Sequence, residues 1–308
     1  MDRIDAMKVF VAAVDEGSLV GAGRRLGRSS GAISRAIACL EAHVGTELLH
    51  RTTRSIKISE TGKRYALTCR RVLTDLEEAE TIVASERSAP SGILTLTATL
   101  HCGEIVLRPI LDAFMDAYPT VSVRLILSDR PLNLIDEGID VALRIGHLAD
   151  STFVAIPVGE VRRVAAAAPH YLDRHPRIAE PGNLASHWIV AMTHFGLDAW
   201  SFPPLPGSPI PRIVHFTPRL ATDSVRIAVA AAIRGCGVTR LFSYHVAERV
   251  REGRLKIVLP GDEPPPMPVH LITPNGRLSL PKVRAFVDCA RPLLRQWFSG
   301  LAKAINES

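Results

Sequence analysis

The residue types best suited to chemistry in this 308-residue chain are small polar and basic side chains in the stretch RSSGAISRAI, residues 28–37. On a helix, the apolar residues of this stretch share one face, and the other face carries Ser30, Gly31, Ser34 and Arg35. A solvated face usually carries long charged side chains, whereas small residues allow close approach to a partner. Arg35 adds a guanidinium that can pair with a phosphate or with O6 and N7 of guanine. The pattern suits a helix that enters a DNA groove, and the alternative is a plain solvated face.

Basic charge is concentrated around this stretch. Residues 18–71 contain eleven Lys or Arg against three Asp or Glu, although the whole chain has a formal net charge of only +6. Arg51 and Arg54 lie in a second basic segment, and Arg28 and Ser29 directly precede the small-residue face. We include these four residues among the candidate DNA contacts. A basic balance is compatible with nucleic acid or with an anionic membrane surface, and its concentration here predicts a polyanionic partner. If that partner is double-stranded DNA, binding should weaken steeply with salt.

Three short helices are predicted to position these side chains. Helical spacing of apolar residues indicates helices over 4–16, 19–26 and about 30–43, with Ser or Gly at their ends. The segment 47–59 then predicts a β-hairpin with Arg51 and Arg54 near its turn. The result is a winged helix-turn-helix pattern. The segment GAGRRLG (21–27) is similar to a dinucleotide-binding loop, but it lies inside a predicted helix rather than after a strand, so we reject that interpretation.

A longer helix is predicted from residue 60 to about residue 88. Its apolar residues alternate at spacings of four and three and form a narrow seam, which consists of Tyr65, Cys69, Val72, Leu76, Ala79 and Val83. A lone helix with such a seam needs a partner, and a second copy of the chain is the simplest one. The alternative is a surface helix that packs on its own domain. The segment Pro90–Gly92 then predicts a hinge.

Beyond the hinge, strand and helix patterns alternate, which predicts an α/β part with a largely parallel sheet. Strands are expected over 93–99, 121–127, 141–145, 161–168, 188–192, 212–220, 237–239, 255–259 and 269–273. Helices are expected over 104–118, 132–137, 224–233 and 282–298.

Hydroxyl, imidazole and thiol groups follow the first of these strands, at Thr99, His101 and Cys102 around Leu100. They precede a predicted helix, whose N-terminal N–H groups attract anions such as carboxylates. Adjacency of His101 and Cys102 does not place a base against a nucleophile, so a pair that lines a cleft is favoured over a Cys/His nucleophile. The sequence shows no recognisable Ser/His/Asp arrangement, and we assign no catalytic residues.

The five cysteines are scattered without a metal-ligand spacing, so neither a metal site nor a cofactor is expected. An odd number of cysteines without a disulfide framework suits a reducing compartment. The first ten residues carry charge throughout, unlike a signal peptide, and no run of 18 apolar residues occurs. The expected location is the cytoplasm, away from membranes.

The chain resembles LysR-type transcriptional regulators over essentially its whole length. In the first 88 residues the resemblance is carried by VFVAAVDEGSL (9–19), RRLGRSSGAISRAIACLE (24–41), VGTELLHRTTR (44–54) and ISETG (58–62). Beyond them it is carried by FMDAYPTVSVRLILSD (114–129), LIDEGIDVALRIG (134–146), AAAAPHYLDRHP (165–176), GCGVTRL (235–241) and LSLPKVRAF (278–286).

The resemblance implies a winged helix-turn-helix DNA-binding domain (1–59), a linker or dimerisation helix (60–89) and an effector-binding domain (90–308). The last would have the periplasmic-binding-protein type of fold, with α/β subdomain I at about 92–160 and 265–308 and subdomain II at about 161–264. The resemblance further implies dimers that pair into tetramers, and contact with RNA polymerase.

The resemblance also places a small-molecule effector between the two subdomains. Besides Thr99, Leu100, His101 and Cys102, it implicates Ser128, Gly146, His147, Thr193, His194 and Asp223. An anionic effector would suit the helix N-terminus there. The alternative for each residue is a helix cap or a polar loop group. Three positions depart from the family: Ser30 stands where the family often has Gln, Leu49 where it usually has Phe, and Thr61 where it usually has Ala. The first change concerns base preference.

The sequence therefore predicts an effector-responsive, sequence-specific regulator of transcription that is not an enzyme. One alternative is a small-molecule-binding protein of the solute-receptor class, which does not account for the basic N-terminal segment. The other alternative is an enzyme with a basic N-terminal module.

Overall fold

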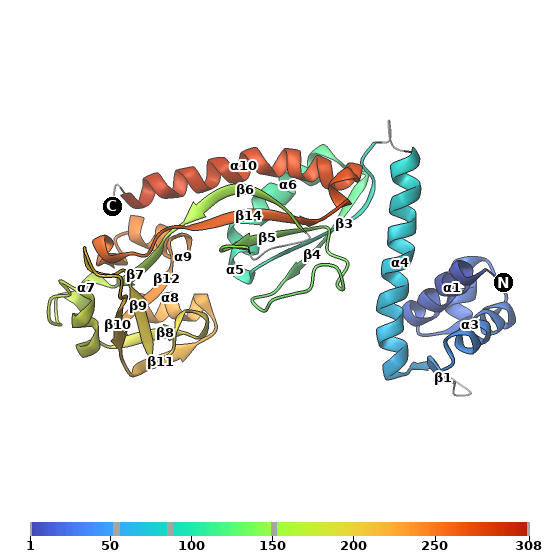
Figure 1. Ribbon diagram of the computed structural model, residues 1–308, viewed down its shortest axis with the longest axis horizontal. Helices are drawn as coiled ribbons and strands as arrows, with labels where there is room; N and C mark the ends of the chain where they lie inside the picture. The colour runs from blue at the N-terminus through green and yellow to red at the C-terminus, as the bar shows by residue number, and fades with distance from the viewer. Residues whose placement is uncertain (1, 52–55, 85–88, 149–152, 307–308) are drawn as a thin grey trace.

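The computed structural model describes residues 2–51, 56–84, 89–148 and 153–306. An N-terminal helical domain, one long helix and an α/β part follow one another along the longest axis of the molecule (Figure 1). Among the described residues, no helix combines the length and the apolar character needed to cross a membrane.

The N-terminal domain consists of the three predicted helices, α1 (Arg3–Glu16), α2 (Leu19–Leu26) and α3 (Ser30–Val44). Their apolar stripes meet in one core, in which Phe10, Ile33 and Ile37 are fully buried. The Ser18 hydroxyl accepts a hydrogen bond from the Gly21 N–H and begins α2. Each helix ends at a glycine with a positive φ angle, as side-chain-free residues permit. The predicted elements are confirmed here to within about one residue.

The hairpin strands β1 (Leu49–Arg51) and β2 (Ile56–Ile58) pair antiparallel and lead into α4 (Glu60–Ala84). The Ser59 hydroxyl accepts a hydrogen bond of 2.9 Å from the N–H of Gly62 and so caps α4. A Cβ atom on Gly62 would overlap the carbonyl oxygen of Leu48. The absence of a side chain therefore lets the start of α4 press against the end of α3 and the hairpin.

The first part of the predicted seam on α4 packs on its own domain. Cys69 is buried in the core of the N-terminal domain, and the Tyr65 ring lies 6.1 Å from the ring of Phe10. Val72, the next seam position, is 37% exposed. The interpretation of the whole seam as a contact with a second copy is therefore wrong for Tyr65 and Cys69, because α1 already covers them.

The first sheet of the α/β part has the strand order β4-β3-β5-β14-β6. Strands β3, β4 and β5 are parallel, whereas β14 runs antiparallel to β5 and β6. The elements are β3 (Gly92–Ala98), α5 (Leu100–Cys102), the π-helix η1 (Gly103–Leu107), α6 (Arg108–Ala117), β4 (Val121–Leu127), β5 (Val141–Ile145), β6 (Phe153–Val161), β14 (Met267–Pro274), the 3₁₀ turn η5 (Arg277–Ser279) and α10 (Pro281–Asn306). Helices α6 and α10 cover this sheet, where the rings of Phe114 and Phe286 lie 5.3 Å apart.

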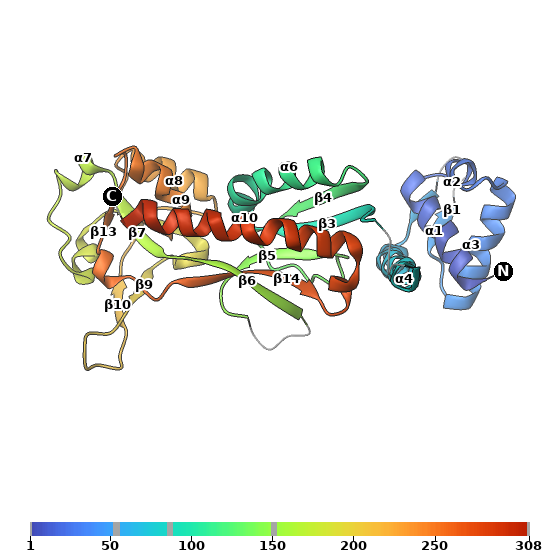
Figure 2. The same cartoon turned by 90° about the horizontal axis from the view of Figure 1, so that it is seen from above.

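The second sheet has the order β11-β8-β12-β7-β13, and a hairpin of β9 and β10 lies beside it. Its elements are β7 (Arg163–Ala167), α7 (Pro169–Leu172), β8 (Ile189–Met192), β9 (Ala199–Phe202), β10 (Arg212–His215), β11 (Pro218–Thr222), α8 (Val225–Ile233), β12 (Val238–Phe242), α9 (Ser243–Arg251) and β13 (Lys256–Val258), with 3₁₀ turns η2 (Pro181–Ser186), η3 (Thr193–Phe195) and η4 (Pro260–Asp262). Helix α10 extends from the first sheet to α9 of the second (Figure 2).

The chain passes between the sheets twice, at Arg162 and over residues 259–266. The two passages are tied together, because the Arg162 guanidinium donates two hydrogen bonds of 2.6 Å to the carboxylate of Glu263. This partner raises the pKa of Arg162. A bidentate, partly buried pair of this kind holds the two connections in a fixed relation.

Two predicted elements of the α/β part are wrong. Residues 132–137 contain a single turn rather than a helix. The Asn133 side chain caps this turn by accepting hydrogen bonds from the N–H groups of Ile135 and Asp136, and Gly138, with a positive φ angle, ends it. The single strand expected over 212–220 is two strands, β10 and β11, which belong to different sheets. Pro218, which has no N–H to donate, stands at the start of the second.

Candidate nucleic-acid interface and ligand cavity

A tight turn between α2 and α3 positions the recognition candidates. The Ser29 hydroxyl accepts a hydrogen bond of 3.2 Å from the Ala32 N–H and caps α3. A Cβ on Gly23 would lie 2.6 Å from the carbonyl oxygen of Arg28, so only glycine lets the turn fold back on α2 at this distance. Ser29 thus acts on the backbone of α3 in addition to lying at the domain surface.

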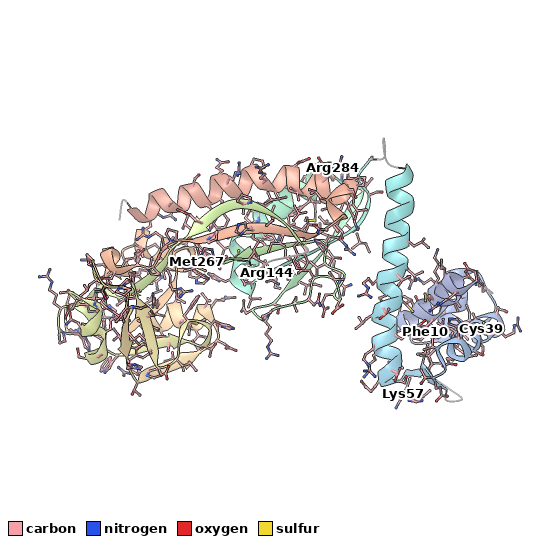
Figure 3. The ribbon with its side chains drawn as sticks, in the orientation of Figure 1. Phe10, Cys39, Lys57, Arg144, Met267 and Arg284 are labelled. Carbon is pink, nitrogen blue, oxygen red and sulfur yellow. The ribbon has the colours of Figure 1, made fainter. Side chains whose placement is uncertain are left out.

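The outer face of α3 is open and made of short side chains. Ser30, Gly31 and Arg35 are exposed, and Ser34 is half-buried. Cys39, one helical turn after Arg35, is also exposed and lies on the side of the domain remote from α4 (Figure 3). No hydrogen bond or ion pair joins Arg35 to another residue in the described part of the chain. The guanidinium of Arg35 is therefore available to a partner in front of this face.

Arg28, by contrast, is engaged within the domain. Its guanidinium donates two hydrogen bonds of 2.8 Å to the carboxylate of Asp5 at the start of α1. These bonds lower the pKa of Asp5 and raise the pKa of Arg28. The pair ties the entry of α3 to α1, so the structure gives Arg28 a positioning role that its location in the sequence does not reveal.

The hairpin is held against α3 by a carboxylate. Oε1 of Glu41 on α3 accepts hydrogen bonds from the N–H groups of Leu48 and Leu49, at 2.9 and 3.1 Å. Strand β1 ends at Arg51, and Lys57 on β2 is exposed (Figure 3). Arg54 lies outside the described residues. The hairpin therefore forms a wing that is attached to α3 through Glu41.

A cavity of about 180 Å³ opens between the end of the first sheet and α8 of the second. We call it the cleft cavity; its lining is Leu100, His101, Glu104, Asp129, Asp223, Ser224, Val225 and Arg226. Three of the predicted effector residues, Leu100, His101 and Asp223, are brought together here from positions more than 120 residues apart. The cavity thus lies where both sheets contribute side chains, as ligand sites between α/β layers do.

Carboxylates dominate the lining of the cleft cavity. Oδ1 of Asp129 accepts a hydrogen bond of 3.0 Å from the N–H of Leu100, which is the first residue of α5. The anion expected at this helix start is therefore supplied by the chain itself. Glu104 lies 3.9 Å from both His101 and Arg226, and Asp223 has no ion pair among the described residues. Three carboxylates against one guanidinium do not fit the expected anionic effector.

The remaining predicted effector residues do not line this cavity. Thr99 contacts the Tyr244 hydroxyl across the sheets. The Ser128 hydroxyl accepts a hydrogen bond from the Arg130 N–H and donates one to the Arg130 carbonyl, which stabilises the loop. Gly146, His147, Thr193 and His194 stand at the ends of β5 and β8.

Cys102 is only 1% exposed, and burial raises its pKa to about 12. Burial therefore favours the protonated thiol over the thiolate, the form that acts as a nucleophile.

Two lining residues, Glu104 and Arg226, were missed by the sequence reasoning. Glu104 lies in the π-helix η1, a distortion that often accompanies functional sites. Gly103 permits it, because a Cβ there would overlap the side chain of Leu127 on β4. Arg226 stands three residues after Asp223, at the start of α8. The sequence predicts a strand followed by a helix near both residues. That the two helix starts lie together follows only from the fold.

Comparison with known proteins identifies the family. Residues 4–63 match the model of the bacterial regulatory helix-turn-helix protein, lysR family, and residues 87–295 match the LysR substrate binding domain. An HTH-type transcriptional regulator of Xanthomonas campestris pv. campestris is 33% identical over 285 residues, which cover 91% of this chain and 82% of that protein.

Solved structures agree with the sequence relatives. CrgA, a LysR-type transcriptional regulator from Neisseria meningitidis, matches with a TM-score of 0.60 and 27% identity, covering 94% of this chain and 98% of that chain. The Vibrio cholerae virulence activator AphB shares the fold, with a TM-score of 0.61, 24% identity and coverage of 94% and 98%. The chain therefore belongs to the LysR family of transcriptional regulators, which join a DNA-binding helix-turn-helix domain to a domain that binds a small-molecule effector.

Proposed function

We propose that the chain acts in the cytoplasm as a dimeric regulator that places α3 of each copy in the major groove of a dyad-related DNA site. The exposed face of Ser30, Gly31 and Arg35 beside the hairpin is the observation that carries this proposal. Short side chains let the helix backbone approach base edges, and Arg35 supplies a bidentate donor for guanine. Arg51 and Arg54 on the hairpin would contact phosphates or a narrow minor groove.

The domain division that supports this role is 1–59 for DNA binding, 60–89 for the linker helix and 90–308 for the effector. Because Tyr65 and Cys69 are covered by α1, the dimer contact would begin at the exposed Val72 and continue towards Leu76. Two such dimers would pair into a tetramer, and the DNA-bound assembly would contact RNA polymerase. The relatives are regulators, and no enzymatic activity belongs to this proposal.

The cleft cavity is proposed as the effector site. Its carboxylates favour a small effector that carries an ammonium or guanidinium group, with Asp223 as its first ion-pair partner. A ligand that binds Asp129 and Asp223 together bridges the two sheets and favours their closed arrangement, which changes the spacing of the DNA-binding domains. Titration calorimetry of the full chain with L-lysine, L-arginine and glutarate tests the charge preference. Asp223→Asn should weaken a cationic ligand, and preferential binding of glutarate would contradict this assignment.

Selection of duplexes from a random library by the full-length chain tests DNA binding. The selected sequences should contain a dyad, and affinity measured by fluorescence anisotropy should fall steeply between about 50 and about 200 mM salt.

Cys39 offers an independent probe, because it is the exposed cysteine on the face that would enter the groove. Bound DNA should slow maleimide labelling of Cys39, while denatured protein labels equally with or without DNA. A dyad-containing duplex that binds tightly and leaves the labelling rate of Cys39 unchanged would contradict the placement of α3.

A further inference from the structure

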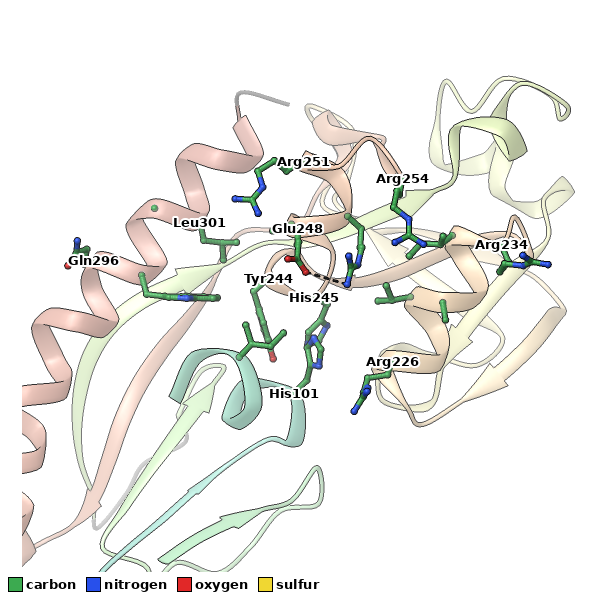
Figure 4. A pocket seen from close by; sticks show the side chains of 18 residues that line it. His101, Arg226, Arg234, Tyr244, His245, Glu248, Arg251, Arg254, Gln296 and Leu301 are labelled. Atoms are coloured by element: carbon green, nitrogen blue, oxygen red, sulfur yellow. Dashed lines mark ion pairs between the residues drawn. The ribbon is translucent and has the colours of Figure 1, made fainter. Parts of the chain in front are cut away.

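A second and larger cavity lies at the junction of the two sheets, between α10 on one side and α8 and α9 on the other (Figure 4). We call it the junction cavity. Its volume is about 900 Å³, five times that of the cleft cavity and within the range of small-molecule sites. Apart from His101 and Arg226, which also line the cleft cavity, its lining residues take no part in the effector binding or DNA binding proposed above.

The inner wall of the junction cavity is apolar. It is formed by side chains of η1, α8, α9 and α10, namely Ile105, Val229, Ala230, Ile233, Ala247, Trp297 and Leu301. Trp297 is half-buried, and its ring lies 6.3 Å from the ring of Tyr244 at the back of the cavity. A wall of this composition gains free energy by covering an aliphatic chain or an aromatic ring.

The rim of the same cavity is strongly basic. Five arginines stand around it, Arg226, Arg234, Arg249, Arg251 and Arg254, against one lining carboxylate, Glu248. Arg249 pairs with Glu248 at 3.4 Å, as Figure 4 shows. Within the described part of the chain, no carboxylate lies within ion-pair distance of Arg234 or Arg251. Arg226, Arg249 and Arg254 pair with Glu104, Glu248 or Glu252. The positive charge of the rim that the protein does not neutralise is therefore that of Arg234 and Arg251.

The deep end of the cavity contains unsatisfied polar atoms. The rings of His101 and His245 meet edge to face, with centroids 5.1 Å apart, and Nδ1 of each is buried without a hydrogen-bond partner. Burial lowers the pKa of both, so the imidazoles are neutral at pH 7. A neutral wall of this kind tolerates an apolar ligand, and a small rotation of either ring would let it share a hydrogen bond with one.

We propose that the junction cavity binds an amphiphilic carboxylate, whose apolar body lies on Trp297 and Ile233 and whose carboxylate pairs with one of the two unpartnered arginines of the rim, Arg234 or Arg251. The apolar wall alone would accept a neutral hydrocarbon, and the basic rim alone would accept any anion. Only a ligand with both parts satisfies the two surfaces together, because charge-assisted bonds from Arg add to burial of apolar area.

The two cavities meet at His101 and Arg226, which line both. A carboxylate in the junction cavity also attracts Arg226 and so weakens the pairing of Arg226 with Glu104, from which it lies 3.9 Å away. The cleft cavity then becomes more negative and more favourable to a cationic ligand. The binding of the two ligands is therefore coupled, with the same factor in both directions. This coupling rests on the proposed effector site, whereas binding to the junction cavity does not.

The test uses the full chain with octanoate as the probe and 1-octanol as its neutral counterpart. Octanoate should quench or shift the fluorescence of Trp297, and titration calorimetry should show it binding at least about tenfold more tightly than the more hydrophobic octanol. Trp297→Phe identifies the optical signal, since Trp188 and Trp200 lie elsewhere. Equal or tighter binding of octanol, or no binding of either, would overturn the proposal.

Two variants separate the parts of the site. Arg234→Ala combined with Arg251→Ala should weaken octanoate by about tenfold and leave octanol unchanged, whereas Arg174→Ala, an exposed arginine far from the cavity, should alter neither. Ala230→Trp, which fills the cavity from α8, should abolish both. DNA binding measured in the same samples separates this proposal from the proposed function. Octanoate binding without DNA binding supports the junction-cavity proposal and contradicts the proposed DNA-binding function. DNA binding without octanoate binding overturns the junction-cavity proposal alone.

Discussion

Replacing Arg35 by alanine should weaken binding of the selected duplex without weakening the fold. Arg35 is exposed on α3 and makes no ion pair with another described residue, so its removal leaves no buried group unsatisfied. If the guanidinium contacts a guanine through two hydrogen bonds, its loss costs about 1–3 kcal/mol per half-site. Each 1.4 kcal/mol is tenfold, so the dissociation constant should rise about 5-fold to about 150-fold for each half-site, and the two factors multiply when a dimer binds both half-sites.

Fluorescence anisotropy with the selected duplex and with a duplex mutated at the contacted guanine measures this effect. Arg35→Ala should bind both duplexes alike, because the discriminating contact is gone. The salt dependence shows whether Arg35 contacts a phosphate or a base. A lost phosphate contact makes the plot of log K against log salt less steep by about 0.9, whereas a lost base contact leaves its slope nearly unchanged.

Arg174→Ala serves as the control for charge alone, since Arg174 is an exposed arginine of the α/β part. The reasoning fails if Arg35→Ala retains wild-type affinity and discrimination, or if it lowers the melting temperature by as much as a core substitution does.

Three further perturbations follow from specific contacts. Glu41→Ala leaves two N–H groups of the hairpin without an acceptor, so the free energy of unfolding should fall by about 1–3 kcal/mol for each N–H that is shielded from water, and DNA binding should weaken. Glu41→Gln keeps a carbonyl oxygen and should lose less stability. Urea titrations followed by circular dichroism measure both. Gly62→Ala should cost about 1–3 kcal/mol in the same assay, because its Cβ overlaps the Leu48 carbonyl; equal stability would contradict the close contact. Burial, with His101 as a lesser cause, holds the pKa of His245 well below its ordinary value. As the pH falls through about 6.5 the unfolded chain takes up the proton first, so the free energy of unfolding should decrease, by at most about 1.4 kcal/mol per pH unit for one histidine, and His245→Gln should flatten that decrease.

The N-terminal domain could be predicted closely because its information is local. Helical spacing, serine caps and glycine ends lie within a few residues of the structures that they specify, and Ser18 and Gly27 act as expected. The role of Arg28 could not be predicted in this way. Its partner, Asp5, is 23 residues earlier, and nothing in the pattern of either segment indicates that the two meet.

The α/β part shows the same contrast on a larger scale. Strands such as β4 and β5 could be predicted because each is a short run rich in Val, Ile and Leu. The cleft cavity depends instead on two helix starts, at Leu100 and Val225, that converge only after both sheets have formed. The negative character of the cavity was missed for this reason: its carboxylates come from three separate segments, and none of these segments is acidic alone.

Ion pairs within the N-terminal domain reduce the number of basic side chains that are free to bind DNA. The excess of basic residues over 18–71 drew attention to DNA, yet two acids just outside that window neutralise part of it. Asp15 accepts hydrogen bonds from both Arg25 and Arg70, and Asp5 binds Arg28. These arginines are fixed between helices, so they release fewer counterions on binding than free ones would. The salt slope should therefore report the exposed basic groups of α3 and the hairpin, and be smaller than eleven basic residues per domain would give.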